Sequence, residues 1–420
     1  MGSEFDFGHA VAVIPNRTVT GGAALRVLEE NLERNCMHLK SFGARASGLR
    51  LERMKASPRF VDGAFVNTKP VAQGLKKGTA APTISEFLCG GQRRVPIAPL
   101  PAQSPLAGWA KRPETGLRAT WLGHSTVLLE VDGARVLTDP VWGERASPVT
   151  FAGPKRFQPV PLPISALPEL DAVIISHDHY DHLDYPTILE LARRNVPFFT
   201  SLGVGAHLQA WGVSPERITE LDWWEQARVP GTELVLSAAP SQHFSGRSLR
   251  VRNSTSWSSF VVKGPKHSVF FSGDTGLTPE YTAIREHFGR FDLVMLEVGA
   301  FHEAWGDIHL GPEHALEAFE LLGGGKFLPV HWGTFNLGIH AWDEPAETLV
   351  RLAPARGVEL VMPLLGEPVE PARVASVKPW WRAIAALESR PAAERPAAVE
   401  ELPSLPPPAA DGDAVEWPLD

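Results

Sequence analysis

Short runs of hydrophobic residues recur between about residues 117 and 370, and turn-forming residues bound each run. Short apolar runs of this kind are typical of buried strands. The runs are TVLLEV, ARVLTD, DAVIIS, ELVLSA, SFVV, SVFFSG, DLVMLEV and KFLPV. Helix-like stretches at 186–195, 278–288 and 312–323 lie between some of them. Strand pairs followed by helices predict sheets that are covered by helices, which is an α/β fold.

The pattern differs on both sides of this region. Residues 20–40 place apolar side chains on one face of a predicted helix, which we expect to pack on the main body, although a membrane surface is an alternative. Residues 55–115 are rich in Pro, Gly and short polar clusters, which favours an extended arm. The Pro- and Ala-rich residues 388–420 predict disorder. We therefore divide the chain into a helix and arm (1–114), a core domain (115–387) and this tail.

The composition is that of a globular protein, with 44% hydrophobic and 21% charged residues among 420. The formal net charge of −8 argues against a nucleic-acid partner, which usually needs a basic face. Cys36 and Cys89 are too few for a disulfide framework, so we expect buried thiols. The opening MGSEF resembles vector-derived sequence without a signal-peptide pattern, in which case a native leader is missing from this chain. We expect a cytoplasmic or peripheral-membrane protein.

Metal-type side chains follow directly after four of the apolar runs. The segment SHDHYDHLD, residues 176–184, alone holds three histidines and three aspartates. In open α/β sheets, ligands gather outside the carboxyl ends of the strands. The predicted metal ligands at these strand ends are His177, His179, Asp181, His182, His243, Asp274 and His331.

The spacing of these side chains favours two neighbouring ions. A His-x-His pair can direct two imidazoles to one ion, while the following Asp-His pair reaches a second. Imidazole nitrogen and carboxylate oxygen suit zinc, although iron, manganese or cobalt would also accept them. Asp274 is the natural bridge between two ions. The alternative is a polar surface loop of fortuitous composition.

The motifs DAVIISHDHYDHLDY, PSQHFSGR, FFSGDTG and VHWGTF resemble those of the metallo-β-lactamase superfamily. Within it, the chain resembles the N-acyl-phosphatidylethanolamine-hydrolysing phospholipase D branch and its bacterial relatives over about residues 115–370. The resemblance implies a four-layer αββα sandwich with two zinc ions. One ion would be held by His177, His179 and His243. The other would be held by Asp181, His182 and His331, with Asp274 bridging.

The resemblance also implies a reaction. A metal-bridging hydroxide would attack a small-molecule or lipid phosphodiester, with Asp181, Asp274 and His309 as catalytic candidates. His309 would orient substrate or protonate a leaving group, and a structural loop histidine is the alternative. Lactonase or amidase activity on the same centre, and a metal-binding scaffold without turnover, are the competing hypotheses. Peripheral membrane contact and a homodimer are left open.

Further residues near these motifs have two interpretations each. Tyr180 would bind substrate or would pack. Asp139 would contact a metal-binding histidine without binding the metal itself, or would form a turn before Pro140. His124 is interpreted as structural, and Glu297 lies in a segment that is more apolar in the lipid-hydrolysing enzyme. The histidines taken as non-ligands are His302, His314 and His340, and the tryptophan pairs taken as packing residues are 223–224 and 380–381.

Overall fold

The computed structural model describes residues 40–71, 91, 93–248, 251–302 and 304–388. Both cysteines, and almost all of the predicted N-terminal helix and C-terminal tail, lie outside these residues. The expectations for them therefore stay predictions, as does the division of the chain into an arm, a core domain and a tail.

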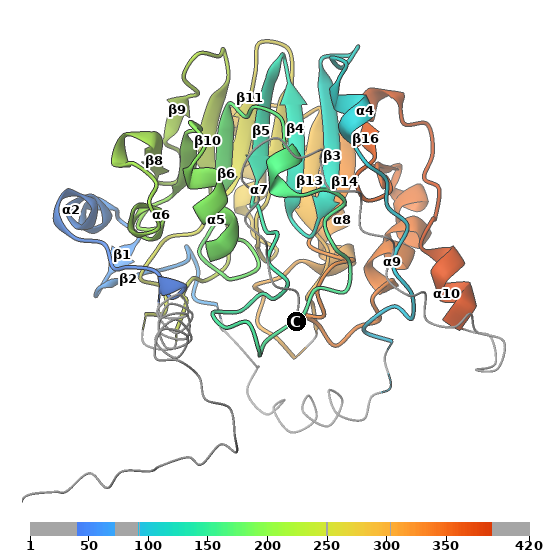
Figure 1. The fold of residues 1–420 in the computed structure, drawn as a ribbon, viewed down its shortest axis with the longest axis horizontal. Helices are drawn as coiled ribbons and strands as arrows, with labels where there is room; N and C mark the ends of the chain where they lie inside the picture. The colour runs from blue at the N-terminus through green and yellow to red at the C-terminus, as the bar shows by residue number, and fades with distance from the viewer. Residues whose placement is uncertain (1–39, 72–90, 92, 249–250, 303, 389–420) are drawn as a thin grey trace, which may run out of the picture.

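The first of two central sheets has seven strands (Figure 1). In order across the sheet they are β16 (Pro368–Val369), β3 (Leu117–Gly123), β4 (Thr126–Val131), β5 (Ala134–Thr138), β6 (Ala172–Ile175), β7 (Phe198–Ser201) and β8 (Ile218–Leu221). Strands β16, β3, β4 and β5 pair antiparallel, and β5 to β8 pair in parallel. The parallel part needs crossovers between its strands, which here include helices.

The second sheet also has seven strands and repeats this plan. Across the sheet they are β15 (Glu359–Leu360), β14 (Lys326–Val330), β13 (Leu293–Glu297), β12 (Ser268–Phe271), β11 (Ser259–Lys263), β10 (Val235–Ala239) and β9 (Gln226–Arg228). Strands β9 to β12 pair antiparallel, and β12 to β15 pair in parallel. All eight predicted runs form strands, and of the six other strands in the two central sheets, four lie at the edges: β15, β9, β16 and β8.

Both faces of the first sheet are buried, which explains why its central strand β6 is apolar at every position. In β6, Ala172 and Ile174 belong to a hydrophobic cluster that the first sheet shares with the second. Val173 and Ile175 belong to a separate cluster on the opposite face. Because successive side chains of a strand point to opposite faces, an uninterrupted apolar run can fill both clusters at once.

Helices cover the outer faces of the two sheets. Those packed on the first sheet are α5 (Tyr185–Ala192) and α6 (Gly205–Ala210), and those packed on the second are α7 (Glu280–Phe288), α8 (Gly311–Leu321) and α9 (Glu344–Leu352). The predicted α/β class and four-layer αββα sandwich are confirmed. The short single-turn helices are η1 (Ile164–Ala166), η2 (Pro215–Arg217), η3 (Ala353–Arg356) and η4 (Pro371–Arg373).

The described segments before β3 and after β16 contain α2 (Gly48–Ala56), β1 (Phe60–Val61), β2 (Ala64–Phe65), α4 (Leu106–Trp109) and α10 (Arg382–Glu388). The segment with α2, β1 and β2 lies at the opposite side of the sandwich from α10, whereas α4 lies beside β16 (Figure 1). Met54 and Phe65 share a small core with Leu202 and Trp257 of the main body. The N-terminal segment is thus anchored by apolar packing, and it contains a helix and a hairpin as well as extended chain. No helix among the described residues is both long and apolar enough to cross a bilayer.

Candidate metal centre

The candidate centre forms where four strands end. Residues 176–184 follow β6, His243 follows β10, Asp274 follows β12 and His331 follows β14. Strands β12 and β14 flank β13 in parallel, so their carboxyl ends meet at one edge of the second sheet. The structure brings all seven predicted ligand side chains together at this place, where five of them are buried and His179 and Asp181 are partly exposed.

One group of donor atoms consists of three imidazole nitrogens and a carboxylate. The Nδ1 of His179 lies 2.9 Å from the Nε2 of His177 and 3.2 Å from the Nε2 of His243. The Oδ2 of Asp274 is 3.9 Å from the Nε2 of His177 and 3.7 Å from the Nε2 of His243. These four donor atoms all lie within 4.8 Å of one another, which is close enough to surround one cation.

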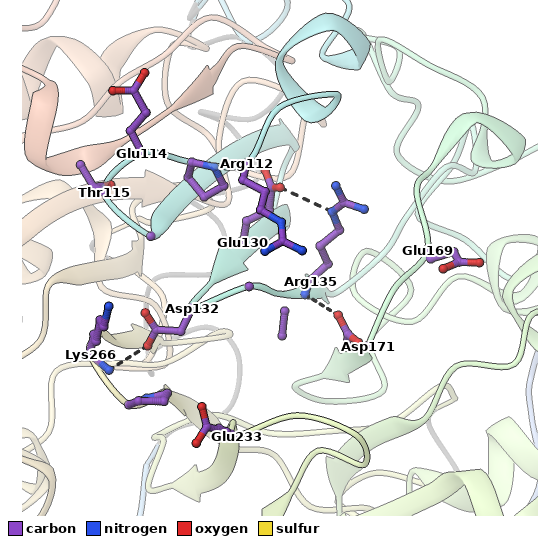
Figure 2. Close-up of a pocket in the computed structure, with 15 residues that line it drawn as sticks. Arg112, Glu114, Thr115, Glu130, Asp132, Arg135, Glu169, Asp171, Glu233 and Lys266 are labelled. Atoms are coloured by element: carbon purple, nitrogen blue, oxygen red, sulfur yellow. Dashed lines mark hydrogen bonds and ion pairs between the residues drawn. The ribbon is translucent and has the colours of Figure 1, made fainter.

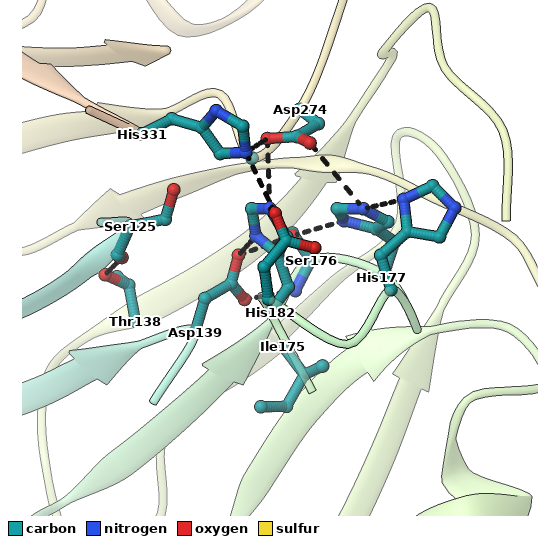
Figure 3. A network of polar contacts seen from close by, with 12 residues as sticks. Ser125, Thr138, Asp139, Ile175, Ser176, His177, His182, Asp274 and His331 are labelled. Atoms are coloured by element: carbon teal, nitrogen blue, oxygen red, sulfur yellow. Dashed lines mark hydrogen bonds and ion pairs between the residues drawn. The ribbon is translucent and has the colours of Figure 1, made fainter. Parts of the chain in front are cut away.

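A second group lies on the other side of Asp274 (Figure 3). Its Oδ1 is 3.1 Å from the Nε2 of His182 and 3.2 Å from the Nε2 of His331. The Oδ2 of Asp181 lies 3.2 Å from the same nitrogen of His331 and 3.5 Å from that of His182. Asp274 therefore turns one carboxylate oxygen toward each group of donors.

Two atoms of the second group show that the residues present fit a bound cation. The Nε2 of His182 and the Oδ1 of Asp274 are buried, and neither has a hydrogen-bond partner among the described residues. An unsatisfied buried polar atom costs about 1–3 kcal/mol, and a shared cation would remove that cost for both atoms. Imidazole nitrogens with carboxylate oxygens suit zinc, iron, manganese or cobalt.

Charge complementarity inside the centre is strong. Burial by itself lowers the pKa of His331, but Asp274 and Asp181 outweigh it and raise the pKa to about 10. Burial raises the pKa of Asp274, yet His182 and His331 hold it well below its usual range. The carboxylates therefore keep their negative charge in this buried place, where it is available to a cation.

Contacts outside the two groups orient the ligand imidazoles. The Oδ2 of Asp139 lies 2.7 Å from the Nδ1 of His182 and accepts a 2.6 Å hydrogen bond from the hydroxyl of Ser176. That hydroxyl oxygen is also 2.9 Å from the Nδ1 of His177 (Figure 3). The Nδ1 of His243 faces the carbonyl oxygen of Ile308 at 2.9 Å. Such partners fix the tautomer and leave the opposite nitrogen directed at the centre.

The ligand loop after β6 is fastened to the chain around it. The side chain of Asp178 points away from the centre and accepts hydrogen bonds from the amide of Gly246 and the hydroxyl of Thr255. The guanidinium of Arg247 donates to the carbonyl oxygens of Asp178 and Ser41. The described N-terminal segment thus reaches the ligand loop through Ser41.

Backbone strain is concentrated at the centre. His124, Asp139 and His331 have φ angles of 52°, 33° and 64°, a region that residues other than glycine seldom adopt. Each such residue costs on the order of 1–3 kcal/mol and persists only where its surroundings hold it. The strand ends are therefore shaped by the geometry of the site as well as by the sheets.

Two residues of the centre were missed as functional residues by the sequence analysis. The Nε2 of His124, in the turn between β3 and β4, lies 2.9 Å from the Oδ2 of Asp181. Burial lowers the pKa of His124 to about 3, so its imidazole is neutral. Glu297 ends β13, is fully buried and contacts His309. The departure from an apolar segment at Glu297 was a usable sign, because a carboxylate in a predicted buried strand needs a partner.

His309 and Tyr180 have different surroundings. The Nδ1 of His309 is 2.9 Å from Glu297 and 3.9 Å from the Oδ2 of Asp274. The hydroxyl of Tyr180 donates a hydrogen bond to the carbonyl oxygen of Arg247. The guanidinium of Arg247 lies 4.0 Å from the centroid of the Tyr180 ring. These contacts of Tyr180 are those of the packing alternative, and its role in substrate binding stays a prediction.

A cavity of about 310 Å³ opens onto the centre. Its polar lining consists of His179, Asp181, Asp274, His309 and His331. Its apolar lining consists of Phe244, Ala300, Trp305, Ile308 and Leu337. A neighbouring cavity of about 420 Å³ shares Trp305 and His309 with it, so these two side chains stand between the two spaces.

A larger cavity of about 610 Å³ lies elsewhere and shares no lining residue with the centre (Figure 2). Two of its carboxylates are satisfied by backbone groups. The Oδ2 of Asp171 accepts a hydrogen bond from the backbone amide of Arg135, and the Oδ2 of Asp132 accepts one from the backbone amide of Lys266. Among the described residues, none that lines this cavity belongs to a group able to hold a metal ion. The chemistry therefore belongs to the smaller cavity.

The residues set aside as non-ligands stay outside both donor groups. Among the described residues, His302, His314 and His340 belong to no cluster able to hold a metal ion. Trp381 is fully buried, Trp380 packs beside it, and the indole of Trp223 donates to a backbone carbonyl. Trp224 is 41% exposed and stacks on Phe288.

Comparison with known proteins places this site in a family. The beta-lactamase superfamily domain matches residues 134–332. N-acyl-phosphatidylethanolamine-hydrolyzing phospholipase D 1 of Caenorhabditis elegans is 37% identical over 254 residues, which are 58% of this chain and 71% of the relative. An uncharacterized protein of Mycobacterium tuberculosis is 45% identical over 349 residues, which are 81% of this chain and 92% of that protein.

A solved structure, the metallo hydrolase Igni18 from Ignicoccus hospitalis, has 21% sequence identity and a TM-score of 0.48. The match covers 60% of this chain and 97% of that one, a level of similarity that does not decide function. The matched domain and the C. elegans relative do identify the family. The chain belongs to the metallo-β-lactamase superfamily, as one of its metal-dependent hydrolases.

Proposed function

We propose that this protein is a dinuclear zinc phosphodiesterase of the phospholipase D type. Its substrates would be N-acyl-phosphatidylethanolamine-like or related phosphodiesters. The observation that carries the proposal is the position of Asp274, whose two oxygens face two separate groups of histidines. A carboxylate in this position can bridge two cations, which is the arrangement that clamps the attacking and leaving oxygens of a phosphodiester.

The donor geometry supports the ligand assignment that the family resemblance implies. His177, His179 and His243 would hold one ion, and Asp181, His182 and His331 would hold the other, with Asp274 between them. When bound, such ions lower the pKa of water toward neutrality and polarise a phosphoryl oxygen. Three or four protein donors to each ion would leave coordination positions open, which favours turnover over a structural role.

The protein's own side chains would orient the substrate. His309 lines the cavity beside Asp274, so its imidazole can hold a substrate oxygen or pass a proton to a leaving oxygen. Phe244, Ile308 and Leu337 form an apolar wall of the same cavity. This wall would exclude water and contact the apolar part of a lipid-like diester.

The named relative supports the choice of bond. The protein from C. elegans is named for hydrolysing N-acyl-phosphatidylethanolamine as a phospholipase D, and it aligns with more than half of this chain. The same reaction type needs no serine or cysteine nucleophile, and the described residues that line the cavity include neither. Peripheral membrane contact and a homodimer stay predictions.

The test combines metal analysis with a substrate panel. Purified protein would be analysed for metal by mass spectrometry and then assayed on N-acyl-phosphatidylethanolamine, a chromogenic phosphodiester, a lactone and an amide. About two zinc ions per chain with diester cleavage would support the proposal. Turnover of the lactone or amide alone would favour the carbonyl-directed alternative. Metal without any turnover would favour a scaffold.

A further inference from the structure

Glu297 is a fully buried carboxylate beside the centre, and it is not one of the predicted ligands. It is the last residue of β13, which lies between β12 and β14, the strands that lead to Asp274 and His331. Burying a carboxylate is costly unless hydrogen bonds compensate, so a residue retained here needs specific partners. Those partners are available for both of its oxygens.

The two carboxylate oxygens differ in their partners. Oε1 accepts hydrogen bonds from the backbone amides of Thr275 at 2.9 Å and Leu310 at 3.2 Å, and it lies 3.2 Å from the Nδ1 of His309. Oε2 lies 2.9 Å from the Nδ1 of His309, and the Nδ1 of His331 is 3.8 Å away. The backbone therefore fixes one oxygen, which leaves the other aimed at the imidazole of His309.

We propose that Glu297 is a positioning residue that holds His309 with its proton on Nδ1 and its Nε2 available to the substrate. This inference rests on the proposed function, in which His309 contacts the substrate. When ionised, the Glu297 carboxylate can only accept hydrogen bonds, so the facing nitrogen then donates. Outside Glu297, the Oδ2 of Asp274 is 3.9 Å from Nδ1, too far for a hydrogen bond.

The amide variant separates this role from simple packing. In Glu297→Gln, the two backbone amides still require an acceptor, so the side-chain oxygen stays on Thr275 and Leu310. The new NH₂ group then faces the Nδ1 of His309, which must accept and give its proton to Nε2. The variant keeps the volume of the side chain but reverses the tautomer of its partner.

The first test reads the tautomer directly and needs no substrate. Zinc-loaded protein labelled with ¹⁵N-histidine would be studied by long-range ¹H–¹⁵N NMR, and a His309→Gln spectrum would assign the His309 signals. We expect the Nδ1–H tautomer in the wild type and the Nε2–H tautomer in Glu297→Gln. The exposed Glu286, on α7, supplies a matched control in Glu286→Gln, which should leave the wild-type tautomer. A wild-type His309 protonated on Nε2 would overturn the proposal without any variant.

The second test measures turnover with whichever substrate the panel identifies. Glu297→Gln should lower kcat by about 10- to 100-fold, with KM changed less than about twofold and the metal content kept. Added to His309→Ala, it should lower kcat no further, because both changes remove one function. Additive losses, full activity, or an activity loss that excess zinc restores would each contradict positioning through His309. If no diester is cleaved, the proposed function fails while the NMR result still decides the role of Glu297.

Discussion

The Oδ2 of Asp139 lies 2.7 Å from the Nδ1 of His182, and both side chains are fully buried. The two residues come from different strand ends, since Asp139 follows β5 and His182 belongs to the loop after β6. Oδ1 of the same carboxylate accepts the amide of Ser176 at 2.7 Å. This contact holds the imidazole with its Nε2 toward Asp274.

Asp139→Asn should weaken metal binding without unfolding the protein. The amide group is nearly isosteric, but its NH₂ cannot accept the proton of the His182 Nδ1. Removing such a supporting acceptor costs about 10- to 100-fold in metal affinity. Zinc competition against a chelator would measure the loss. Asp62→Asn is the matched control, because Asp62 is exposed and asparagine tolerates its φ of 52°. Unchanged zinc affinity in the Asp139 variant would exclude the supporting role.

Histidine variants of the two donor groups test whether two ions bind. His243→Ala removes a donor of the first group, and His331→Ala removes a donor of the second. Each should lose about one of the two expected ions, and each should lower hydrolysis at least about 1000-fold because both ions act on one phosphodiester. Metal content and kcat would be measured on the same preparations. Full activity of His243→Ala would remove that residue from the ligand set.

Trp381 should anchor the segment that follows β16 to β14, the strand that leads to His331. It is fully buried, lies edge-on to Trp332 beside His331, and its indole donates to Glu347 at 2.6 Å. Trp381→Ala should destabilise the fold by about 3–5 kcal/mol, the usual cost of a large cavity. Trp381→Phe should cost less because part of the ring remains. Urea unfolding would measure both, and an alanine variant as stable as the wild type would contradict the packing assignment.

The turn between β4 and β5 should make stability depend on acidic pH. Burial raises the pKa of Asp132, but the His267 imidazole and the amides of Lys266 and His267 outweigh it, and the folded pKa is lowered. Stabilisation by Asp132 is therefore fully present above the unfolded pKa of about 3.9, and it is lost as pH falls through the lower folded value.

Asp132→Asn isolates this effect, since asparagine also tolerates the φ of 50° at this position. Urea unfolding of the wild type and the variant would be compared between pH 6 and pH 3. The difference in unfolding free energy between the wild type and the variant should be constant near pH 6 and should become smaller below about pH 4. If this difference instead became larger toward acidic pH, the ionised form of Asp132 would not be the form that stabilises the fold.

Local pattern was sufficient to predict the central strands. KFLPV and TVLLEV form β14 and β4 with the predicted bounds, because strands buried on both faces read as mainly apolar runs. The edge strands were not predicted. Gln226–Arg228 and Glu359–Leu360 have few neighbours to bury them, so their composition is close to that of loops.

The functional roles of buried polar residues were harder to predict. His124 was interpreted as structural, yet its Nε2 lies 2.9 Å from Asp181 inside the centre. Glu297 was noticed only as a departure from an apolar segment, and its contact with His309 spans a loop whose path no local pattern encodes. Hydrogen bonds between distant segments follow from how the strands are paired, which periodicity does not determine.

The sequence by itself determined the strands and the residue that follows each one, because burial and turn formation depend on neighbours along the chain. It therefore supplied the seven candidate ligands. Only the tertiary structure decided which of them lie together in one group of donors, since His177 and Asp274 meet only after β6 and β12 take their places in two sheets. Parallel pairing of β12, β13 and β14 then brings Asp274, Glu297 and His331 to one edge, so that separate strand ends become one site.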